Sequence, residues 1–239
     1  MKERFINELK KMKAMPFKQL ISYIWDYYKI GIIVTVCVVI FFIALLKGIL
    51  SNNPDALKIM ACNMLPSMTT SEEEAHVEDT INQDYLNYTG KTAGSKPYIE
   101  LDHSADLLIE DSYTASVMVQ KVTASIGAQL VDIFAGPQEG ILHYAQLNVY
   151  EDIRDYLPED TVSALEEKDL ICTATISPDT EAGEDFEPYD VWYGIKADGM
   201  TTLTEAGYDT EGIVIGIIAG TEKHDVAVEV MNMLIDDLL

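Results

Sequence analysis

Basic residues are scarce in most of this chain, and their scarcity excludes one large class of partner. Residues 48–239 carry eight lysines and arginines against 37 aspartates and glutamates, a net charge of −29. A domain this acidic repels the phosphate backbone, so we predict that it does not bind nucleic acid. The charge does not imply disorder, because 48% of the chain is hydrophobic.

Sequence motifs of catalysis and of metal binding are also missing. The chain has no Cys-x-x-Cys or His-Glu-x-x-His spacing, no phosphate-binding glycine loop and no nucleophile elbow. The acidic run 179–187 lacks the oxygen spacing of an EF-hand. We therefore predict no metal, no cofactor and no catalytic residue. His103, which follows Asp102 at the end of a predicted strand, is the best candidate if the protein is an enzyme.

One long stretch without charge lies near the start of the chain. Residues 30–46 read IGIIVTVCVVIFFIALL and are bracketed by Lys29 and Lys47. With snorkelling lysines and flanking tyrosines, this run approaches the ~20 residues that span a bilayer core of ~30 Å. Seven basic residues against three acidic ones before it predict that this end is cytoplasmic. We expect a cytoplasmic segment 1–29, a transmembrane helix 30–50 and an extracytoplasmic domain 51–239.

Two features of the N-terminal segment leave alternatives open. A cleaved signal peptide competes with the anchor, but a long charged region precedes the run and no small-x-small cleavage site follows it. Phe5, Leu9 and Met12 share one side of a helix with lysines between them. That pattern predicts either a helix lying on the anionic leaflet or lysines that only fix topology. We favour an uncleaved single-pass anchor in the cell membrane.

Strand-like and helical stretches alternate after the polar linker 51–55. Apolar runs predict the strands, and capping and turn signals predict the helices between them. The predicted strands are 56–65, 97–101, 130–135, 170–176, 191–197 and 213–219. The predicted helices begin at Ser71, Ser112, Gln138, Pro158 and Thr221. Such alternation predicts an α/β fold, with a mostly parallel sheet and helices on both faces.

Individual residues sharpen this outline. Ser71 and Glu74 have the spacing of a capping box, and Thr221 is the expected cap of the terminal helix.

Cys62 and Cys172 each lie in an apolar strand-like stretch. They predict either a disulfide, which an outside compartment permits, or two buried small hydrophobic residues.

The stretch 129–157, QLVDIFAGPQEGILHYAQLNVYEDIRDYL, resembles the first lobe of the extracellular solute-binding proteins of ABC transporters. These proteins have the two-lobed type II periplasmic-binding fold. Residues 189–197 look like the strand that leaves that lobe, and 212–239 look like the returning strand with its helix. In the family a second lobe of a hundred or more residues lies between those strands, whereas only 198–212 lie there in this chain. High-affinity solute capture therefore does not follow.

The resemblance implies a ligand site at the carboxyl ends of the strands. Five side chains lie at strand ends or helix starts on that edge, where aromatic faces stack on sugars or hold apolar ligands. They are Tyr113, Gln138, Trp192, Tyr193 and His103. For Trp192 a core position is an equal alternative, and for Phe134 we favour the core.

These observations predict a non-enzymatic, membrane-anchored extracytoplasmic binding or interaction module. Its partner is either another protein or a small-molecule ligand. A reduced ABC-transporter substrate receptor and an extracytoplasmic enzyme of unknown class are the alternatives.

Overall fold

The computed structural model describes residues 16–51, 56–66, 69–94, 98–177 and 187–239. The chain divides into two compact units, residues 1–54 and residues 55–239. The predicted surface helix with Phe5, Leu9 and Met12 lies outside the described residues, as does most of the acidic loop.

The first unit holds one long helix, α2 (Phe17–Ser51), which begins directly after Pro16. Its window Lys29–Leu46 is long and apolar enough to cross a membrane, and none of the window is buried within the structure. Phe41, for example, is 61% exposed. A helix that is apolar on every side normally lies in a core or in a lipid bilayer. By length and composition, α2 is therefore compatible with a transmembrane anchor.

The second unit is built on one six-stranded sheet with the order β2-β1-β3-β6-β5-β4. The strands are β1 (Leu57–Ala61), β2 (Ile99–Asp102), β3 (Ile133–Pro137), β4 (Ile171–Ile176), β5 (Tyr189–Lys196) and β6 (Ile213–Ile217). Only the pairings of β1 with β2 and with β3 are parallel, and the other three pairings are antiparallel. The predicted α/β sheet is present, but its parallel part is confined to β2, β1 and β3.

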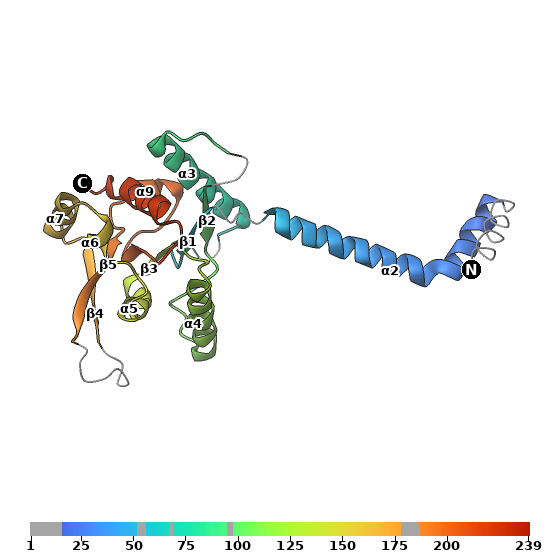
Figure 1. The fold of residues 1–239 in the computed structure, drawn as a ribbon, viewed down its shortest axis with the longest axis horizontal. Coiled ribbons are helices and arrows are strands. Elements are labelled where there is room, and N and C mark those ends of the chain that lie inside the picture. Colours follow the sequence, from blue (N-terminus) through green and yellow to red (C-terminus); the bar gives the residue numbers. More distant parts are fainter. Residues whose placement is uncertain (1–15, 52–55, 67–68, 95–97, 178–186) are drawn as a thin grey trace. The chain divides into compact units, whose positions relative to one another are not determined.

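Helices cover both faces of the sheet, as the alternation predicted (Figure 1). The helices after α2 are α3 (Ser71–Thr89), α4 (Ser112–Gly127), α5 (Gln138–Gln146), α6 (Ile153–Tyr156), α7 (Glu159–Glu167), α8 (Thr201–Ala206) and α9 (His224–Ile235). Side chains of α3, α6, α7, α8 and α9 pack in one hydrophobic cluster, and those of α4 and α5 pack in the other.

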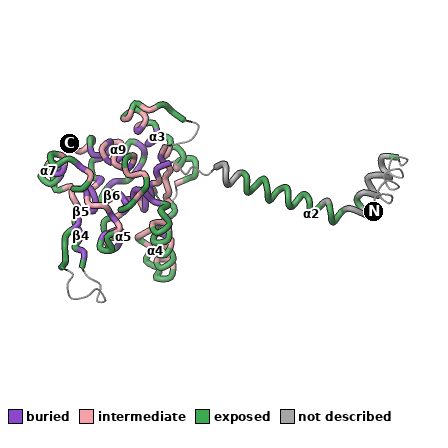
Figure 2. The backbone as a smooth tube through the Cα atoms, viewed as in Figure 1, coloured by how far each residue is buried: buried purple, intermediate pink, exposed green. Residues whose placement is uncertain are grey.

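The two clusters take alternate residues of the strands, because successive side chains of a strand point to opposite faces. Ile133 and Ile215 belong to the α3 and α9 side, whereas Phe134 and Val214 belong to the α4 and α5 side. The buried residues form the centre of the domain in Figure 2. Phe134 is fully buried, which confirms its predicted place in the core.

Helix α3 closes the outer edge of β2. The Asn82 side chain accepts hydrogen bonds from the backbone of Tyr98 and Ile99 and donates to the Ile99 carbonyl, at 2.8 to 3.0 Å. Glu78 accepts from the Leu101 N–H at 3.0 Å. These side chains take the place of a neighbouring strand, so β2 does not present an open edge.

The predicted helix caps are wrong by a short distance. The capping box at the start of α3 pairs Thr70 with Glu73, one residue before the predicted pair Ser71 and Glu74. At the last helix, Thr221 accepts a hydrogen bond from the Lys223 N–H, but α9 begins only at His224 and its cap position has no side-chain bond. Glu74 is thereby free to face away from the cap.

Both cysteines of the domain are buried free thiols, so the disulfide alternative is wrong and the buried alternative is confirmed. Cys62 directly follows β1 and Cys172 lies in β4, four steps away in the sheet order. At ~4.8 Å a step, this separation is ~19 Å. A disulfide needs Cα atoms within ~7 Å.

Candidate functional site

The carboxyl ends of the parallel strands are the place where the sequence predicted a ligand site, and the chain itself fills this edge. Asn63, just after β1, accepts a hydrogen bond from the Leu107 N–H at 2.8 Å and donates to Asp106 at 2.6 Å. The Leu107 side chain then packs onto Gly136 and Gly140. A Cβ on Gly140 would lie 2.7 Å from the Leu107 Cβ, so glycine is what lets this segment approach β3 and α5 so closely.

The short connection between β5 and β6 closes the same edge from another side. Residues 198–212 contain helix α8, which buries Leu203 and Ala206. The Asp209 N–H donates to the Met64 carbonyl at 2.9 Å, and the Gln138 N–H donates to the Gly212 carbonyl at 3.0 Å. The segment 198–212 therefore caps the sheet at the edge where the sequence predicted a ligand site.

The five side chains predicted at a ligand site do not meet in one place. Tyr113 is 78% exposed in the first turn of α4, and Gln138 is exposed at the start of α5. Tyr193 is fully buried on the α4 and α5 face, whereas Trp192 packs against the α3 and α9 face. Only His103 lines a pocket at the predicted edge.

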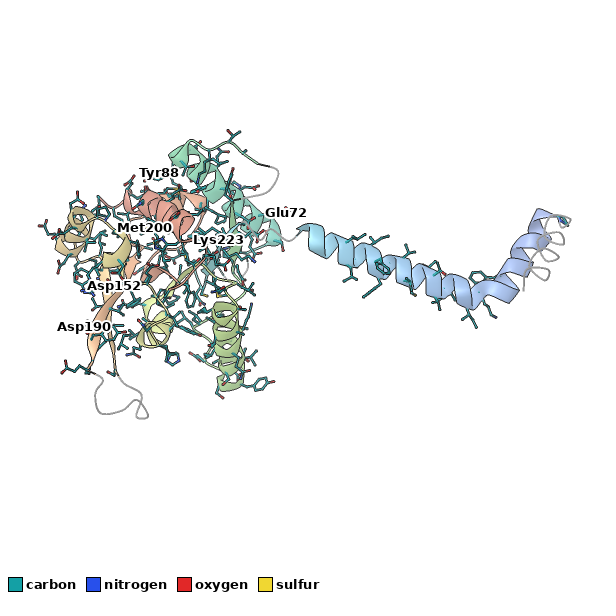
Figure 3. The ribbon with its side chains drawn as sticks, viewed as in Figure 1. Glu72, Tyr88, Asp152, Asp190, Met200 and Lys223 are labelled. Atoms are coloured by element: carbon teal, nitrogen blue, oxygen red, sulfur yellow. The ribbon has the colours of Figure 1, made fainter. Side chains whose placement is uncertain are left out.

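Trp192 is held by a charged neighbour at the opposite end of the sheet. The Arg154 guanidinium lies 4.9 Å from the centre of the indole ring and also pairs with Asp152. Burial raises the pKa of Asp152, but hydrogen bonds from Arg154 outweigh it and the net pKa is lowered. Figure 3 shows Asp152 and Asp190 at this end, and Arg154 also donates to the Asp190 carbonyl at 3.2 Å. The Arg154 guanidinium therefore packs over the Trp192 indole ring.

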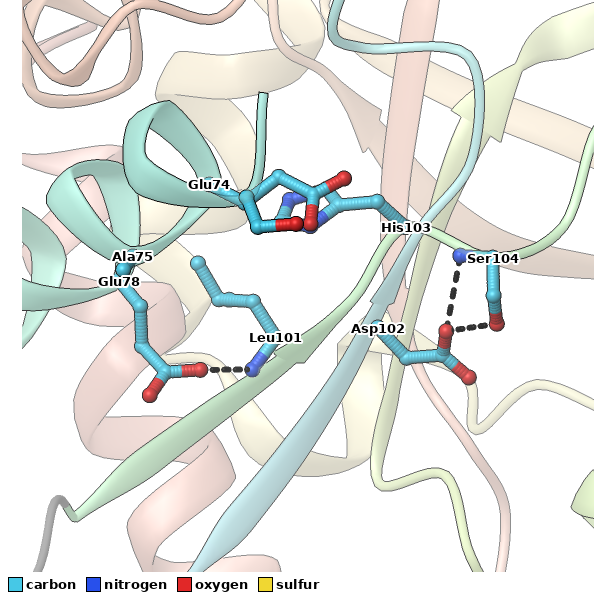
Figure 4. A pocket seen from close by; sticks show the side chains of 8 residues that line it. Glu74, Ala75, Glu78, Leu101, Asp102, His103 and Ser104 are labelled. Carbon is cyan, nitrogen blue, oxygen red and sulfur yellow. Dashed lines mark hydrogen bonds between the residues drawn. The ribbon is translucent and has the colours of Figure 1, made fainter. Parts of the chain in front are cut away.

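The pocket at His103 is formed between α3 and the end of β2 and has a volume of about 370 Å³ (Figure 4). Its lining residues are Ser71, Glu74, Ala75, Glu78, Leu101, Asp102, His103 and Ser104. Helix periodicity places Glu74 and Glu78 on one side of α3, one turn apart. Leu101 and Ala75 supply its apolar part. Three carboxylates thus share the lining of one open pocket with a single imidazole.

The electrostatics of this pocket favour a neutral His103. Burial lowers the pKa of His103, although Glu74 and Asp102 act in the opposite direction. Its Nε2 lies 2.6 Å from the Tyr208 hydroxyl. Burial together with the nearby Glu78 and Glu74 raises the pKa of Tyr208, so the phenol keeps its proton. With both groups neutral, Nε2 and the Tyr208 hydroxyl share one hydrogen bond, and the imidazole tautomer sets which of them donates.

The carboxylates of the pocket differ in their surroundings. Burial raises the pKa of Glu78, helped by the charges of Glu100 and Asp79 and opposed by the Leu101 N–H. Asp102 accepts hydrogen bonds from the Ser104 N–H and hydroxyl, and the Ser104 carbonyl and hydroxyl are also bound by the ammonium of Lys121. The Ser104 hydroxyl thus already has two hydrogen-bond partners, Asp102 and Lys121. The three carboxylates give this open pocket a charge that attracts a cationic group.

Sequence reasoning singled out His103, but it did not predict that α3 and Tyr208 lie beside it. Glu74 was expected at the helix cap, and Glu78 had only its spacing from Glu74 as a signal. Tyr208 is 105 residues from His103 in sequence, and nothing in the pattern of either segment links them. Among the residues that the structure describes, no group of three or more histidines, cysteines, aspartates and glutamates is placed to hold a metal ion.

Comparison of the chain with protein-family models, with curated proteins and with solved structures finds no match to any of them. The resemblance to solute-binding proteins therefore stays a prediction from the sequence pattern.

Proposed function

We propose that this chain is a single-pass membrane protein that displays its α/β domain outside the cytoplasm as a binding or interaction module. The observation that carries the proposal is the wholly exposed apolar window Lys29–Leu46 of α2. Burying such a surface in lipid is favourable by about 0.8 kcal/mol for each CH₂ group. The net charge of +4 on residues 1–29 and −29 on residues 48–239 supports the orientation.

The closed carboxyl edge supports an interaction module over a reduced transport receptor. A solute receptor of the periplasmic-binding fold encloses its ligand between two lobes. In such a receptor the crevice at the carboxyl ends of the strands is open to the ligand. Here Leu107 and the α8 segment occupy that position, and Asn63 holds the first of them by one hydrogen bond to Leu107 and one to its neighbour Asp106. A ligand would have to displace the chain's own buried contacts.

The surroundings of His103 support binding over catalysis. Its Nε2 is taken by Tyr208, and the Ser104 hydroxyl is shared between the Asp102 carboxylate and Lys121. A general acid or base must lie within hydrogen-bond reach of the proton that it moves, and the Nε2 of His103 already bonds the Tyr208 hydroxyl. The pocket instead offers carboxylates around a small apolar surface, which suits an aliphatic amine.

The anchor and its orientation are tested together in cells that express the full chain. We expect the protein to stay in the membrane pellet after alkaline carbonate extraction, and protease added to intact cells to remove residues 51–239. Release by carbonate would contradict the anchor. Cleavage only after permeabilisation would contradict the orientation.

The pocket is tested separately with n-butylamine and the full chain in detergent micelles. We expect butylamine, and not butyrate, to shift the imidazole NMR signals of His103. The shift should be lost in Glu74→Gln and kept in the control Glu139→Gln, which changes an exposed glutamate on α5. No shift in the parent chain would remove the amine site and leave the anchored module untouched.

A further inference from the structure

The sheet ends differently on its two sides. At β2, side chains of α3 bind the outer backbone groups, whereas β4 is the last strand on the opposite side and pairs only with β5. No other backbone–backbone hydrogen bond joins Ile171–Ile176 to the part of the chain that the structure describes. Figure 1 shows β4 at the outer margin of the sheet. Because alternate residues of an edge strand turn their N–H and C=O groups outward, this edge is open to a further strand.

Strand β4 lacks the features that usually protect an exposed edge. Natural sheets blunt such an edge with lysine, with proline or with a bulge in the edge strand. The sequence of β4, ICTATI, contains no charge and no proline. The pairing of β4 with β5 shifts register once, but the extra residue is Tyr193 on β5. The six residues of β4 therefore form an uninterrupted, uncharged pairing edge.

The side chains of β4 define what can lie beside it. Cys172, Ala174 and Ile176 are buried on the α4 and α5 face of the sheet. Thr173 and Thr175 are exposed on the other face. Threonine side chains suit a β-branched neighbour across a strand pair, because branched side chains pack well on a pleated surface. We therefore expect a partner strand to have β-branched residues at its centre.

Exposed acidic side chains lie near both ends of β4. Three are in the five residues before it, and two are at or just before the start of β5, which pairs with the end of β4. They are Glu166, Glu167, Asp169, Glu187 and Asp190. The Asp190 carboxylate accepts a hydrogen bond from the Thr175 hydroxyl at 2.7 Å, so it lies beside the exposed side of β4.

The basic side chains near these acids already have partners within the domain. The Lys196 ammonium pairs with Asp169 at 2.9 Å, and Arg154 pairs with Asp152. Lys168 donates to a backbone carbonyl near the end of the chain. The surplus of acid attracts a positively charged strand and repels a second copy of this domain, since residues 48–239 carry a net charge of −29.

We propose that the outer edge of β4 binds an extended peptide segment of another protein, which adds a strand to the sheet and carries basic residues on both sides of a β-branched centre. Main-chain hydrogen bonds supply the affinity in this mode of recognition, and the flanking charges supply the specificity. The inference rests on the proposed interaction function and names its partner. It uses neither the anchor nor the pocket at His103, so its failure leaves the tests of those features unaffected.

Fluorescence anisotropy with the full chain in zwitterionic detergent micelles tests the binding. The probe is the labelled peptide Lys-Lys-Val-Thr-Val-Thr-Lys-Lys. We expect it to bind at least about tenfold more tightly than the same peptide with N-methyl groups on its Val-Thr-Val-Thr core, which keeps the charge but cannot donate main-chain hydrogen bonds. Equal binding of the two peptides would overturn the proposal, and so would the absence of binding by either.

A matched pair of variants tests the place. Thr173→Lys adds a positive charge to β4, and Gln120→Lys adds the same charge at an exposed position of α4. We expect the first to weaken peptide binding at least about tenfold and the second to change it less than about twofold. Equal effects would show that the peptide responds only to the charge of the whole domain, which would overturn the proposal.

Amide hydrogen exchange of the parent chain shows which edge the peptide occupies. We expect the peptide to slow exchange in β4 and to leave β2 unchanged, because α3 closes that edge. Protection of another segment in place of β4 would overturn the proposal. A dimer in light scattering whose β4 amides are protected without peptide would assign the edge to a second copy and would overturn it as well.

Discussion

Asp132 joins three separate segments of the domain, and its removal gives the sharpest stability prediction. Asp132 is 4% exposed and lies just before β3. It accepts hydrogen bonds from the Lys58 N–H at 2.8 Å and from the Thr221 hydroxyl, and it pairs with the Lys223 ammonium at 3.4 Å. Lys223, labelled in Figure 3, also donates to the Ala56 carbonyl, where the domain begins.

The substitution Asp132→Ala leaves the Lys58 N–H and the Lys223 ammonium without this acceptor. Breaking a buried ion pair by removing one partner costs about 3–5 kcal/mol. Asp132→Asn keeps the shape and one acceptor oxygen, so its cost should be the smaller one of an impaired buried hydrogen bond, about 1–3 kcal/mol. The cost expected for Asp132→Ala is a large part of the 5–15 kcal/mol by which an ordinary domain is stable.

Urea unfolding of the full chain in micelles measures both costs. Trp192 is the one tryptophan of residues 48–239, so in a Trp25→Phe background its fluorescence reports the domain. Asp79→Ala is the matched control, because Asp79 is an exposed aspartate on α3, and it should change the free energy of unfolding by less than about 0.5 kcal/mol. A cost below about 1 kcal/mol for Asp132→Ala would refute the reasoning, since the three segments would then be held by other contacts.

Three further predictions concern the pocket and its supports. His103 should titrate below about 6.5 in NMR, and because its folded pKa is lowered, the stability it provides is lost as the pH falls from about 6.5 through that pKa; a midpoint at or above 6.5 would contradict the burial argument. Gly140→Ala should cost about 1–3 kcal/mol by overpacking against the Leu107 Cβ, and Leu107→Gly, which removes that atom, should relieve part of that cost in the double variant; additive losses would show that the two do not touch. Asn82→Ala should cost about 1–3 kcal/mol and expose β2 to faster amide exchange, and unchanged exchange would mean that α3 does not protect this edge.

Much of the fold follows from local sequence patterns. Helix α5 begins at the predicted Gln138, and β4 begins at Ile171, one residue after the prediction. The short helices α6 and α8 were missed. With four and six residues they carry too little periodicity to detect, and they are held by tertiary contacts such as the burial of Leu203.

The direction of the strands was the harder problem, although a signal existed. Parallel neighbours need a crossover, usually a helix of a dozen or more residues. The connection from β4 to β5 has no helical pattern, and the connection from β5 to β6 holds only α8, so antiparallel pairing was the simpler solution for both. The pocket at His103 could not be foreseen, because Tyr208 reaches it only through the packing of α8 against α3.

The side of the membrane on which the α/β domain lies is the most direct test of the central claim. Ser163→Cys introduces an exposed thiol on α7 by exchanging one atom, in a Cys37→Ser background. A membrane-impermeant maleimide should label this thiol in intact cells and should label Asn7→Cys only after permeabilisation. Labelling of position 163 only in permeabilised cells, with position 7 labelled in intact ones, would contradict the account.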